Sequence, residues 1–589
     1  MRYLLILFLA LISQQINAQL KCKEYNEVLL THLLTPAGPV PTAYDANGVY
    51  PYNSYCETTN RSVPKNYRMV ALENDLIKVI VCPDLGGKVV SMIHKKSGKE
   101  VLYNPGLVRQ TRILPRFYFV AGGIEVSFPI SHSPSQNDPV SYKIDKTKNR
   151  IYVTCGQREL HFGMQFSVEY SLGSADSFLT QRAVYFNPGK NAYPWMSWSN
   201  AALPSAPDTK YDFPKGKVLT HASKIDSIVW TSKTEQDIKE MTGFFWKTKD
   251  VNAFGAFTSS LGVGLYHVAD KSAPGIKLWS YGVKNDKNWA LLSTARKEPY
   301  IEIQAGPISN QSIKLELQPN EKRNHVEFWF PTDMELDINQ LQVPQITIRS
   351  INEIPLFDWS TSGEVKLWNN LTESYKAKMS VPSPPDPILG IWAPSGMENL
   401  DEPFTWAINK SYEGNKDIWA FHYGAWLAGR NKIDKSIAIL LPLNSGISKA
   451  LLARLQKKKG DWDGARKSYE LILDQWLLLH PQVVIERDKL LRSIGKSTLD
   501  ERGKWLEQVD ALKDEWIIAR KIQWLIDKER FEDAKVLLLS TPFQKVHQTY
   551  TRTGLWKQIT KRLNIPFYPI PESLGEDQLA VFGAYREYE

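Results

Sequence analysis

Cysteine is scarce in this chain, and the four that occur, Cys22, Cys56, Cys82 and Cys155, all lie in the first 155 residues. The sequence has no C-x-x-C pair and no H-E-x-x-H motif, which are common arrangements of zinc ligands. We therefore expect no metal site and no other cofactor. An even number of cysteines in an oxidising compartment allows three pairing schemes. We favour a disulfide between Cys22 and Cys56, because both lie in loop-like sequence, and buried thiols are the alternative for Cys82 and Cys155.

Beyond its first residues, the chain lacks an apolar run of the roughly 20 residues that a membrane-spanning helix requires. It opens with Met1 and Arg2, continues with an apolar stretch from Tyr3 to Ile12, and then reaches the small residue Ala18. A positive charge, a short apolar segment and a small residue at the cleavage point are the parts of a secretory signal peptide. We expect residues 1–18 to be removed and the mature protein to be secreted or periplasmic, without a transmembrane segment.

A concentrated basic patch is also missing. The net charge is +9, but no stretch combines clustered Lys and Arg with interleaved aromatic residues, so nucleic-acid binding is not expected. Hydrophobic residues make up 43% and charged residues 23% of the chain, which is the balance of a globular protein and excludes extensive disorder. The 589 residues are enough for two to four domains, at about 150 residues per domain.

Residues 66–350 have the pattern of β-strands separated by turns. From Phe166 to Leu172, apolar residues alternate with polar ones, which is typical of a strand with one buried face. A turn sequence, Gly173 to Asp176, separates this strand from a second one at Phe178 to Phe186. Because helical patterns are absent between such strands, we predict a large antiparallel β-sandwich for residues 66–350, after an N-terminal extension at 19–65.

The sequence that follows has a different pattern. A proline-rich stretch, Pro382 to Pro387, cannot continue a helix or a central strand, so we expect residues 351–414 to form a linker or strap. From residue 415 onward, apolar residues recur at helical spacing. We therefore predict a change of fold class, from strands to helices, within the last third of the chain.

An internal repeat is visible in the helical region. Trp462 and Phe531 are each followed three positions later by an alanine, and these two alanines, Ala465 and Ala534, are 534 − 465 = 69 residues apart. This offset is close to twice the roughly 34-residue period of tetratricopeptide repeats, and a weaker copy lies between them. We predict a tetratricopeptide-like α-helical domain for residues 415–589, with an unrelated helical bundle as the alternative.

Two separated glutamates are candidates for catalysis. Glu125 follows a Gly-Gly pair and precedes His132 by seven residues, in a segment broken by glycine and proline that suits a loop at a cleft. Glu302 lies in a strand-like run, where alternation places Glu302 and Gln304 on the side opposite to the intervening isoleucines. The alternative for these residues is a structural role, as hydrogen-bonding glutamates and a surface histidine.

Aromatic side chains close to an amide favour a carbohydrate ligand. Trp195 and Trp198 lie just before Asn200, and the chain has 19 tryptophans, Trp279 among them. Indole faces stack on the C–H faces of sugar rings, and an amide can both donate to and accept from hydroxyl groups. We therefore predict that Trp195, Trp198, Trp279, Asn200 and Gln304 bind sugar, with core packing as the alternative for the tryptophans.

These segments resemble the galactose mutarotase-like fold of the aldose 1-epimerase superfamily. The late-strand motif of that superfamily, Glu then any residue then Gln, is matched by Glu302 and Gln304, and the resemblance implies that Glu302 is a base. The acid histidine of the epimerases falls at Met196, and a thioether cannot donate a proton, so simple mutarotase chemistry is disfavoured. The layout also resembles a poorly characterised family of secreted bacterial proteins that join such a sandwich to tetratricopeptide repeats.

These features together predict an exported carbohydrate-active enzyme, and a glycoside hydrolase in polysaccharide degradation is the leading hypothesis. Glu125 and Glu302 would act as acid and as base or nucleophile across one glycosidic bond, and His132 would bind substrate or tune a proton. A non-catalytic glycan-binding protein with a helical protein-interaction domain is the second hypothesis. A sugar epimerase and a polysaccharide lyase are further alternatives. The expected partners are an oligo- or polysaccharide and, through the helical repeats, a protein.

Overall fold

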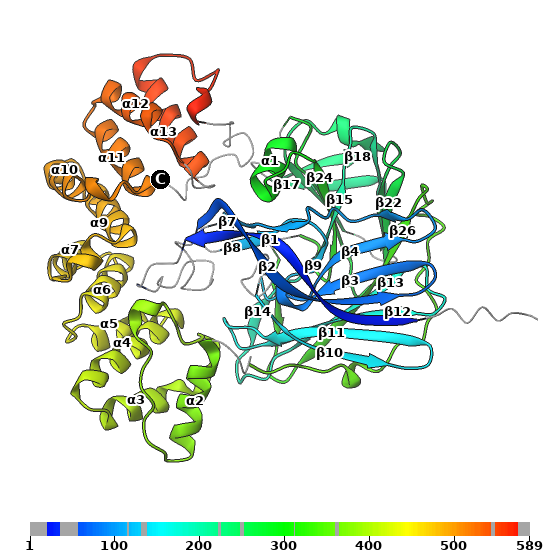
Figure 1. Ribbon diagram of the computed structural model, residues 1–589, viewed down its shortest axis with the longest axis horizontal. Coiled ribbons are helices and arrows are strands. Elements are labelled where there is room, and N and C mark those ends of the chain that lie inside the picture. Colours follow the sequence, from blue (N-terminus) through cyan, green and yellow to red (C-terminus); the bar gives the residue numbers. More distant parts are fainter. Residues whose placement is uncertain are drawn as a thin grey trace, which may run out of the picture.

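The computed structural model shows a β-sandwich joined to a curved array of helices (Figure 1). It describes residues 20–35, 40, 57–114, 117–130, 138–221, 225–247, 252–284, 286–310, 313–359, 364–543 and 548–574. The predicted fold class, a large antiparallel sandwich followed by an α-helical domain, is confirmed. Within these ranges, no helix has the length and apolar character needed to cross a membrane.

The sandwich consists of a 13-stranded and a 9-stranded sheet. In spatial order, the larger sheet contains β18 (Ile225–Trp230), β17 (Gly216–His221), β20 (Thr242–Lys247), β23 (Gly275–Ser280), β24 (Tyr300–Gly306), β15 (Ser199–Pro204), β9 (Ile124–Val126), β4 (Lys88–His94), β3 (Ile77–Cys82), β2 (Glu57–Glu73), β1 (Lys21–Thr35) and β6 (Leu107–Val108), with β5 (Lys99–Glu100) paired to β4. The smaller sheet contains β10 (Ser141–Lys146), β11 (Arg150–Arg158), β12 (Gln165–Gly173), β13 (Leu179–Phe186), β26 (Lys322–Thr332), β22 (Val263–Ala269), β21 (Asn252–Thr258), β16 (Thr209–Asp212) and β19 (Lys233–Thr234). Two separate strand pairs are β14 (Tyr193–Trp195) with β25 (Leu315–Leu317), and β7 (Gln110–Leu114) with β8 (Phe117–Val120).

The main hydrophobic core lies between the two sheets. In β12, Phe166, Val168, Tyr170 and Leu172 all belong to this core, as the alternation predicted, but Ser167, Glu169 and Ser171 are buried too, so the prediction of only one buried face is wrong. Strands of the larger sheet contribute isoleucine, valine and leucine side chains in the same period of two. The opposite side chains of the larger sheet therefore lie on its outer face, away from the smaller sheet.

The first described strands extend the larger sheet. β1 and β2 pair antiparallel, with Lys21 opposite Glu73 at one end and Thr35 opposite Glu57 at the other. Residues 19–65 were predicted to be an N-terminal extension before the sandwich, and within them β1 and the first half of β2 add to its larger sheet. The reason is that their backbone groups continue the hydrogen-bonding ladder of the sheet.

The structure describes three of the four cysteines, and none of these three forms a disulfide. Cys22 lies opposite Leu72 and has a free thiol, whereas Cys56 lies outside the described residues. Because Cys56 is outside the described ranges, the predicted Cys22–Cys56 disulfide stays a prediction. Cys82 and Cys155 are buried free thiols, as the alternative interpretation held.

Helices make up the second half of the structure, and one further helix, α1 (Asp286–Thr294), lies within the sandwich half. The others are α2 (Glu364–Lys376), α3 (Asp401–Lys410), α4 (Glu413–Gly429), α5 (Ile433–Leu440), α6 (Gly446–Lys458), α7 (Trp462–Glu470), α8 (Gln475–Leu478), α9 (Pro481–Ile494), α10 (Leu499–Gln508), α11 (Glu515–Asp527), α12 (Phe531–Ser540) and α13 (Gln548–Leu563). The helices α2 and α3 occupy part of 351–414, where a linker was expected. They are part of the helical domain because they bury Trp368 and Phe404 in its core.

The internal repeat is visible as repeated helix pairs. The pair α6 and α7 and the pair α11 and α12 start at positions that keep the 69-residue offset, and Ala465 and Ala534 are both completely buried. A residue with positive φ follows α4, α6, α9, α11 and α13, at Asn431, Gly460, Gly495, Glu529 and Asn564. The regular spacing of these turns fits tetratricopeptide-like helical hairpins.

The helical array curves along one side of the sandwich and contacts it at several points (Figure 1). The N–H of Gly396 donates to the carbonyl of Leu160 at 2.8 Å. Val40 is buried among the helices, where its N–H donates to the side chain of Gln482 and its carbonyl accepts from the same amide. Trp516 of α11 packs at an aromatic cluster on the outer face of the larger sheet. The helical domain therefore lies against the face that carries the candidate site.

Candidate active site

Five polar side chains form a row across five adjacent strands of the larger sheet. In register order the row is Lys277 on β23, Gln304 on β24, Asn200 on β15, Glu125 on β9 and Lys88 on β4. Their exposed fractions lie between 3% and 8%. Because directly paired residues point to the same face of a sheet, these side chains lie side by side. We refer to these five residues as the polar row.

The polar row lies on the outer face of the sheet. The residues that flank it along each strand, such as Ile303 on β24, Ala201 on β15 and Ile124 on β9, belong to the core between the sheets. Successive side chains of a strand point to opposite faces, so the polar row faces away from that core. The predicted alternation, with Glu302 and Gln304 opposite to the isoleucines, is confirmed.

Glu302 lies on the same face of β24 as Gln304 of the polar row, two residues before it. Its Oε1 accepts a hydrogen bond of 2.8 Å from the hydroxyl of Tyr281, and its Oε2 accepts one of 3.1 Å from the amide of Gln304. Burial and the neighbouring charge of Glu302 raise the pKa of Tyr281 well above its usual value of 10, so this phenol stays protonated and donates. Both carboxylate oxygens of Glu302 are thus oriented by fixed donors.

An aromatic wall supports Tyr281. Its ring stacks on Trp289 of α1 at a centroid distance of 4.7 Å, and the indole N–H of Trp289 donates to the hydroxyl of Tyr300 at 2.7 Å. Tyr300 in turn stacks on Tyr103 at 4.5 Å. These contacts fix the hydroxyl that holds Glu302, which makes α1 part of the support of the candidate site.

Glu125 faces a buried lysine. The Nζ of Lys88 lies 3.5 Å from Oε2 of Glu125, and the same ammonium donates to the carbonyl of Val120. Burial lowers the pKa of Lys88, while the charges of Glu125 and Glu302 oppose that shift. Lys88 therefore interacts electrostatically with both glutamates, and the structure brings the two predicted carboxylates to one region of the outer face.

Lys277, at the other end of the polar row, is enclosed by aromatic rings. Its Nζ lies 5.7 Å from the ring centroid of Trp198, 5.4 Å from that of Phe245 and 5.0 Å from that of Trp279. Burial lowers the pKa of Lys277 to about 8, and the charge of Glu302 opposes this shift. At neutral pH the ammonium remains mostly charged, stabilised in part by the ring faces.

The sugar-binding predictions have different outcomes in the structure. Trp195 packs in the core between the sheets, against Phe128 and Tyr185, so the structure does not bring it to the polar row. Trp198 is also buried, but it lines the aromatic enclosure of Lys277. Asn200 and Gln304 belong to the polar row, and Trp279 is half-buried beside it.

His132 lies outside the described residues, so its predicted role stays a prediction. Met196, which occupies the histidine position of the epimerase motif, packs against Trp198, Phe245 and Ile308. Among the described residues, these neighbours supply no acid in place of the histidine. In the part of the chain that is described, no three His, Cys, Asp or Glu side chains are grouped as a metal site.

Sequence reasoning missed three residues of the site: Lys88, Lys277 and Tyr281. Lys88 directly follows Gly86 and Gly87, and a glycine pair between strand-like segments signals a turn and does not point to a site. Lys277 alternates with two core residues, Ile276 and Leu278, as Glu302 does with Ile301 and Ile303. A lysine at such a position in a strand is a detectable signal, but without the register nothing connects it to Glu302.

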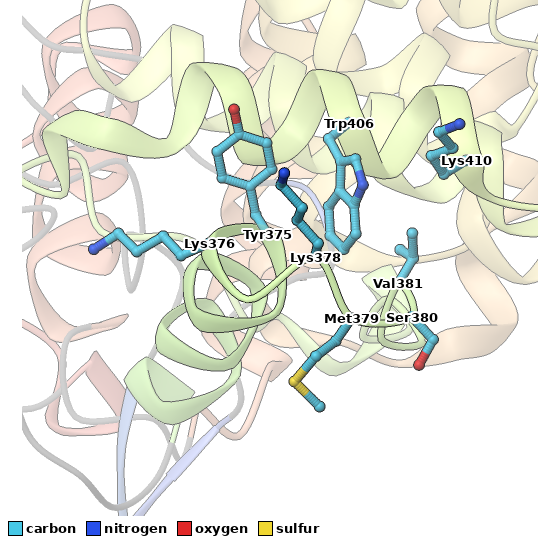
Figure 2. Close-up of a pocket in the computed structure, with 8 residues that line it drawn as sticks. All are labelled: Tyr375, Lys376, Lys378, Met379, Ser380, Val381, Trp406 and Lys410. Carbon is cyan, nitrogen blue, oxygen red and sulfur yellow. The ribbon is translucent and has the colours of Figure 1, made fainter.

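A separate groove lies in the helical domain, between the end of α2 and α3 (Figure 2). It has a volume of about 730 Å³ and is lined by Tyr375, Lys376, Lys378, Met379, Ser380, Val381, Trp406 and Lys410. The lining contains no carboxylate or histidine, so it lacks the acid–base pair that glycosidic bond cleavage needs. A protein partner for the helical domain stays a prediction.

Comparisons with known proteins agree with this division of the chain. A family model described as a domain of unknown function, DUF5107, matches residues 44–332, and a second model, described as a C-terminal domain, matches residues 368–559. Two galactose mutarotase-like structures match only about half of the chain. The one from Clostridium acetobutylicum is 14% identical, with 46% of this chain and 96% of that chain covered at a TM-score of 0.35. The galactose mutarotase related enzyme from Lactobacillus acidophilus is 12% identical, with coverages of 47% and 100% and a TM-score of 0.34.

One solved structure matches almost the whole chain. It is a TPR-domain containing protein from Parabacteroides distasonis ATCC 8503, which is 62% identical to this chain. The match covers 95% of this chain and 98% of that chain, with a TM-score of 0.89. The chain therefore belongs to the same family as this TPR-domain containing protein, in which a β-sandwich precedes a tetratricopeptide-like helical domain.

Proposed function

We propose that this protein is an exported carbohydrate-active enzyme, a glycoside hydrolase in which Glu125 and Glu302 act across one glycosidic bond. The observation that carries the proposal is that both carboxylates lie on the outer face of one sheet, with the amides of Asn200 and Gln304 between them. Amides at that place suit the vicinal hydroxyls of a sugar, because each can donate and accept.

The register gives the spacing of the two carboxylates. Glu125 and Glu302 are separated by two strand spacings across the sheet and by two residues along β24. With strands about 4.8 Å apart and a rise of about 3.4 Å per residue, their Cα atoms are about 12 Å apart. Side chains that lean toward each other from that distance fit the roughly 6.5–9.5 Å between carboxyl groups of inverting hydrolases better than the roughly 5–5.5 Å of retaining ones.

The chemistry follows from an inverting arrangement. Glu302, held by Tyr281 and Gln304, takes a proton from a water molecule whose oxygen attacks the anomeric carbon. The bond from that carbon to the leaving oxygen breaks, and Glu125 passes a proton from the adjacent ammonium of Lys88, 3.5 Å away, to the leaving oxygen. The half-buried ring of Trp279 offers a face on which a sugar ring can stack.

The proposal is tested by turnover of a panel of plant, algal and host glycans. We expect Glu302→Gln and Glu125→Gln to lower the turnover rate about 10²- to 10⁴-fold, because each loses a proton-transferring group while keeping its shape. Glu298→Gln, an exposed position just before β24, is the control and should match the wild type. In the same reactions, NMR should show that the first-formed sugar has the inverted anomeric configuration.

Three outcomes contradict parts of this proposal. Unchanged turnover in Glu302→Gln would exclude the assigned base. A first-formed sugar of retained configuration would exclude the inverting arrangement. Binding of a glycan by the wild type without turnover at any pH would replace the enzyme by a glycan-binding protein that uses the same side chains.

A further inference from the structure

Lys277 carries a buried positive charge that no described carboxylate contacts directly, although the charge of Glu302 compensates it in part from a distance. It is 3% exposed, and none of the described residues forms a hydrogen bond or an ion pair with its ammonium. The lysine at the opposite end of the polar row differs, because Lys88 has both the carboxylate of Glu125 and the carbonyl of Val120 as partners. The ammonium at one end of the polar row, Lys88, therefore has direct partners, whereas the ammonium at the other end, Lys277, does not.

An unpaired ammonium in this position is costly to keep. Transfer of a charged amine out of water is unfavourable unless a counter-charge or hydrogen-bond acceptor compensates it. The faces of Trp198, Phe245 and Trp279 compensate only in part, since a cation–π contact contributes about 0.5–2 kcal/mol. A hydrophobic residue would be more stable inside such an aromatic enclosure, so the retained charge points to a ligand that pairs with it.

Two unsatisfied polar atoms lie in the same region. Oδ1 of Asn200 is buried and has no hydrogen-bond partner among the described residues. The indole N–H of Trp198, one of the rings around Lys277, is likewise buried without an acceptor in that part of the chain. Buried polar atoms are usually paired in native proteins, and these two lie beside the polar row, where a bound ligand can supply their partners.

These atoms define the chemistry of the missing group. The ammonium of Lys277 and the indole N–H of Trp198 are both donors, which together suit the oxygens of an anion. Asn200 lies on β15, two strands away from Lys277 on β23. Its Oδ1 is a hydrogen-bond acceptor and so suits a sugar hydroxyl. A sugar that carries an anionic substituent next to free hydroxyls supplies both kinds of group.

We propose that Lys277 anchors an anionic substituent, a carboxylate or a sulfate ester, so that the substrate of this site is an acidic glycan. The inference rests on the proposed function for the place of the sugar, but it concerns recognition and is tested by binding. Glu125 and Glu302 remain the groups that cleave the bond. Lys277 selects which glycan reaches them.

The test measures binding by isothermal titration calorimetry with matched pairs of oligosaccharides. One pair is oligogalacturonate and its methyl ester, and another is a sulfated galactan oligosaccharide and its desulfated form. We expect the full-length protein to bind at least one anionic member at least tenfold more tightly than its neutral counterpart. Lys277→Met should abolish this preference, and Lys277→Arg should retain part of it because the charge is kept. The exposed Lys271→Met is the control and should keep the wild-type preference.

The variants separate a binding role from a structural one. Met fills the aromatic enclosure without a buried charge, so Lys277→Met should unfold at the same temperature as the wild type or at a higher one. The anchor is overturned if the wild type binds neutral and anionic members equally, if it binds no anionic member, or if Lys277→Met keeps the preference. Turnover of a neutral glycan that depends on Glu302 would overturn the anchor and leave the hydrolase. A preference for the anionic member that depends on Lys277, without turnover of any glycan, would support the anchor and overturn the hydrolase.

Discussion

Glu125 is positioned by the two glycines that precede it. Gly122 and Gly123 have φ values of 91° and 70°, in the region that only glycine occupies readily. A Cβ added at Gly123 would lie 2.1 Å from the carbonyl oxygen of Val89 on β4, which is backbone and cannot move aside. The close approach of the two strands is what places Glu125 opposite Lys88.

Replacement of Gly123 by alanine tests this requirement. Gly98 has the same φ of 70°, but a Cβ there would meet nothing within 4 Å, so Gly98→Ala isolates the backbone strain. We expect Gly98→Ala to lower the free energy of unfolding by about 1–2 kcal/mol and Gly123→Ala to lower it by about 2–5 kcal/mol, because the latter adds a steric clash. Urea denaturation followed by circular dichroism measures both values. Equal losses in the two variants would show that the approach to Val89 is unimportant.

The sequence predicted single residues best where one strand contained the whole signal. Glu302 and Gln304 were placed correctly because the alternation with Ile301 and Ile303 is local. Trp195 and Trp198 could not be told apart from the sequence, since a run of aromatic residues does not show which of them turns into the core. Lys277 was missed because its meaning depends on its pairing opposite Gln304, and strand order is a property of the whole sheet.

At the scale of elements, a buried ion network joins the helices α9, α10 and α11. Asp488 of α9 is completely buried and accepts from Nε of Arg502 at 2.8 Å and from Nε of Arg520 at 2.5 Å. Arg502 also contacts Asp527 of α11 at 2.8 Å. Ion pairs therefore connect α9 with α10, α10 with α11, and α9 with α11 inside the repeat array.

Asp488→Asn should destabilise this network strongly. The change leaves the buried guanidinium group of Arg520 without its counter-charge and leaves Arg502 with Asp527 alone, and the loss of one partner of a buried ion pair costs about 3–5 kcal/mol. Asp500→Asn is the matched control, because Asp500 lies on α10 of the same array and pairs with Lys528 at 2.9 Å in an exposed position. Exposed pairs contribute little, so this control should unfold like the wild type. Similar urea midpoints for the two variants would contradict a stabilising role of Asp488.

The boundaries of elements were less predictable than their type. Strands of the sandwich and the helix pairs around Ala465 and Ala534 follow regular apolar periods, and they were recognised. The proline-rich stretch at Pro382 to Pro387 masked the helices on either side of it, because proline marks the end of a helix but does not show whether another begins beyond it. β1 was missed since its partner, β2, lies beyond a long connection.

At the scale of the whole molecule, the two halves contain buried ionisable groups that respond differently to acid. In the helical half, burial lowers the pKa of His422 from 6.5 to about 4, while its hydrogen bond to the carbonyl of Pro385 opposes the shift. In the sandwich, burial of Glu327 is outweighed by His325 and His267, which hold the pKa of this carboxyl well below its usual 4.5. Each group couples the stability of its own half to pH.

The signs of these shifts predict that moderate acid weakens the helical half first. Unfolded histidine binds a proton more readily than folded His422 at pH values between 6.5 and about 4, so the stability of the helical half falls as the pH is lowered through this window. The loss at pH 5 is about 2 kcal/mol. The contribution of Glu327 is fully present above pH 4.5 and is lost only below it, so this carboxyl causes no loss of stability in the sandwich at pH 5. Scanning calorimetry at pH 7.5 and pH 5 should therefore show a larger fall of the unfolding temperature for the helical transition than for the sandwich. His422→Gln, which can still donate to Pro385 but does not titrate, should reduce that shift, whereas His94→Gln in the sandwich should leave it unchanged.

An equal shift of both transitions in the wild type, or an undiminished one in His422→Gln, would exclude His422 as the group that makes the helical half sensitive to acid.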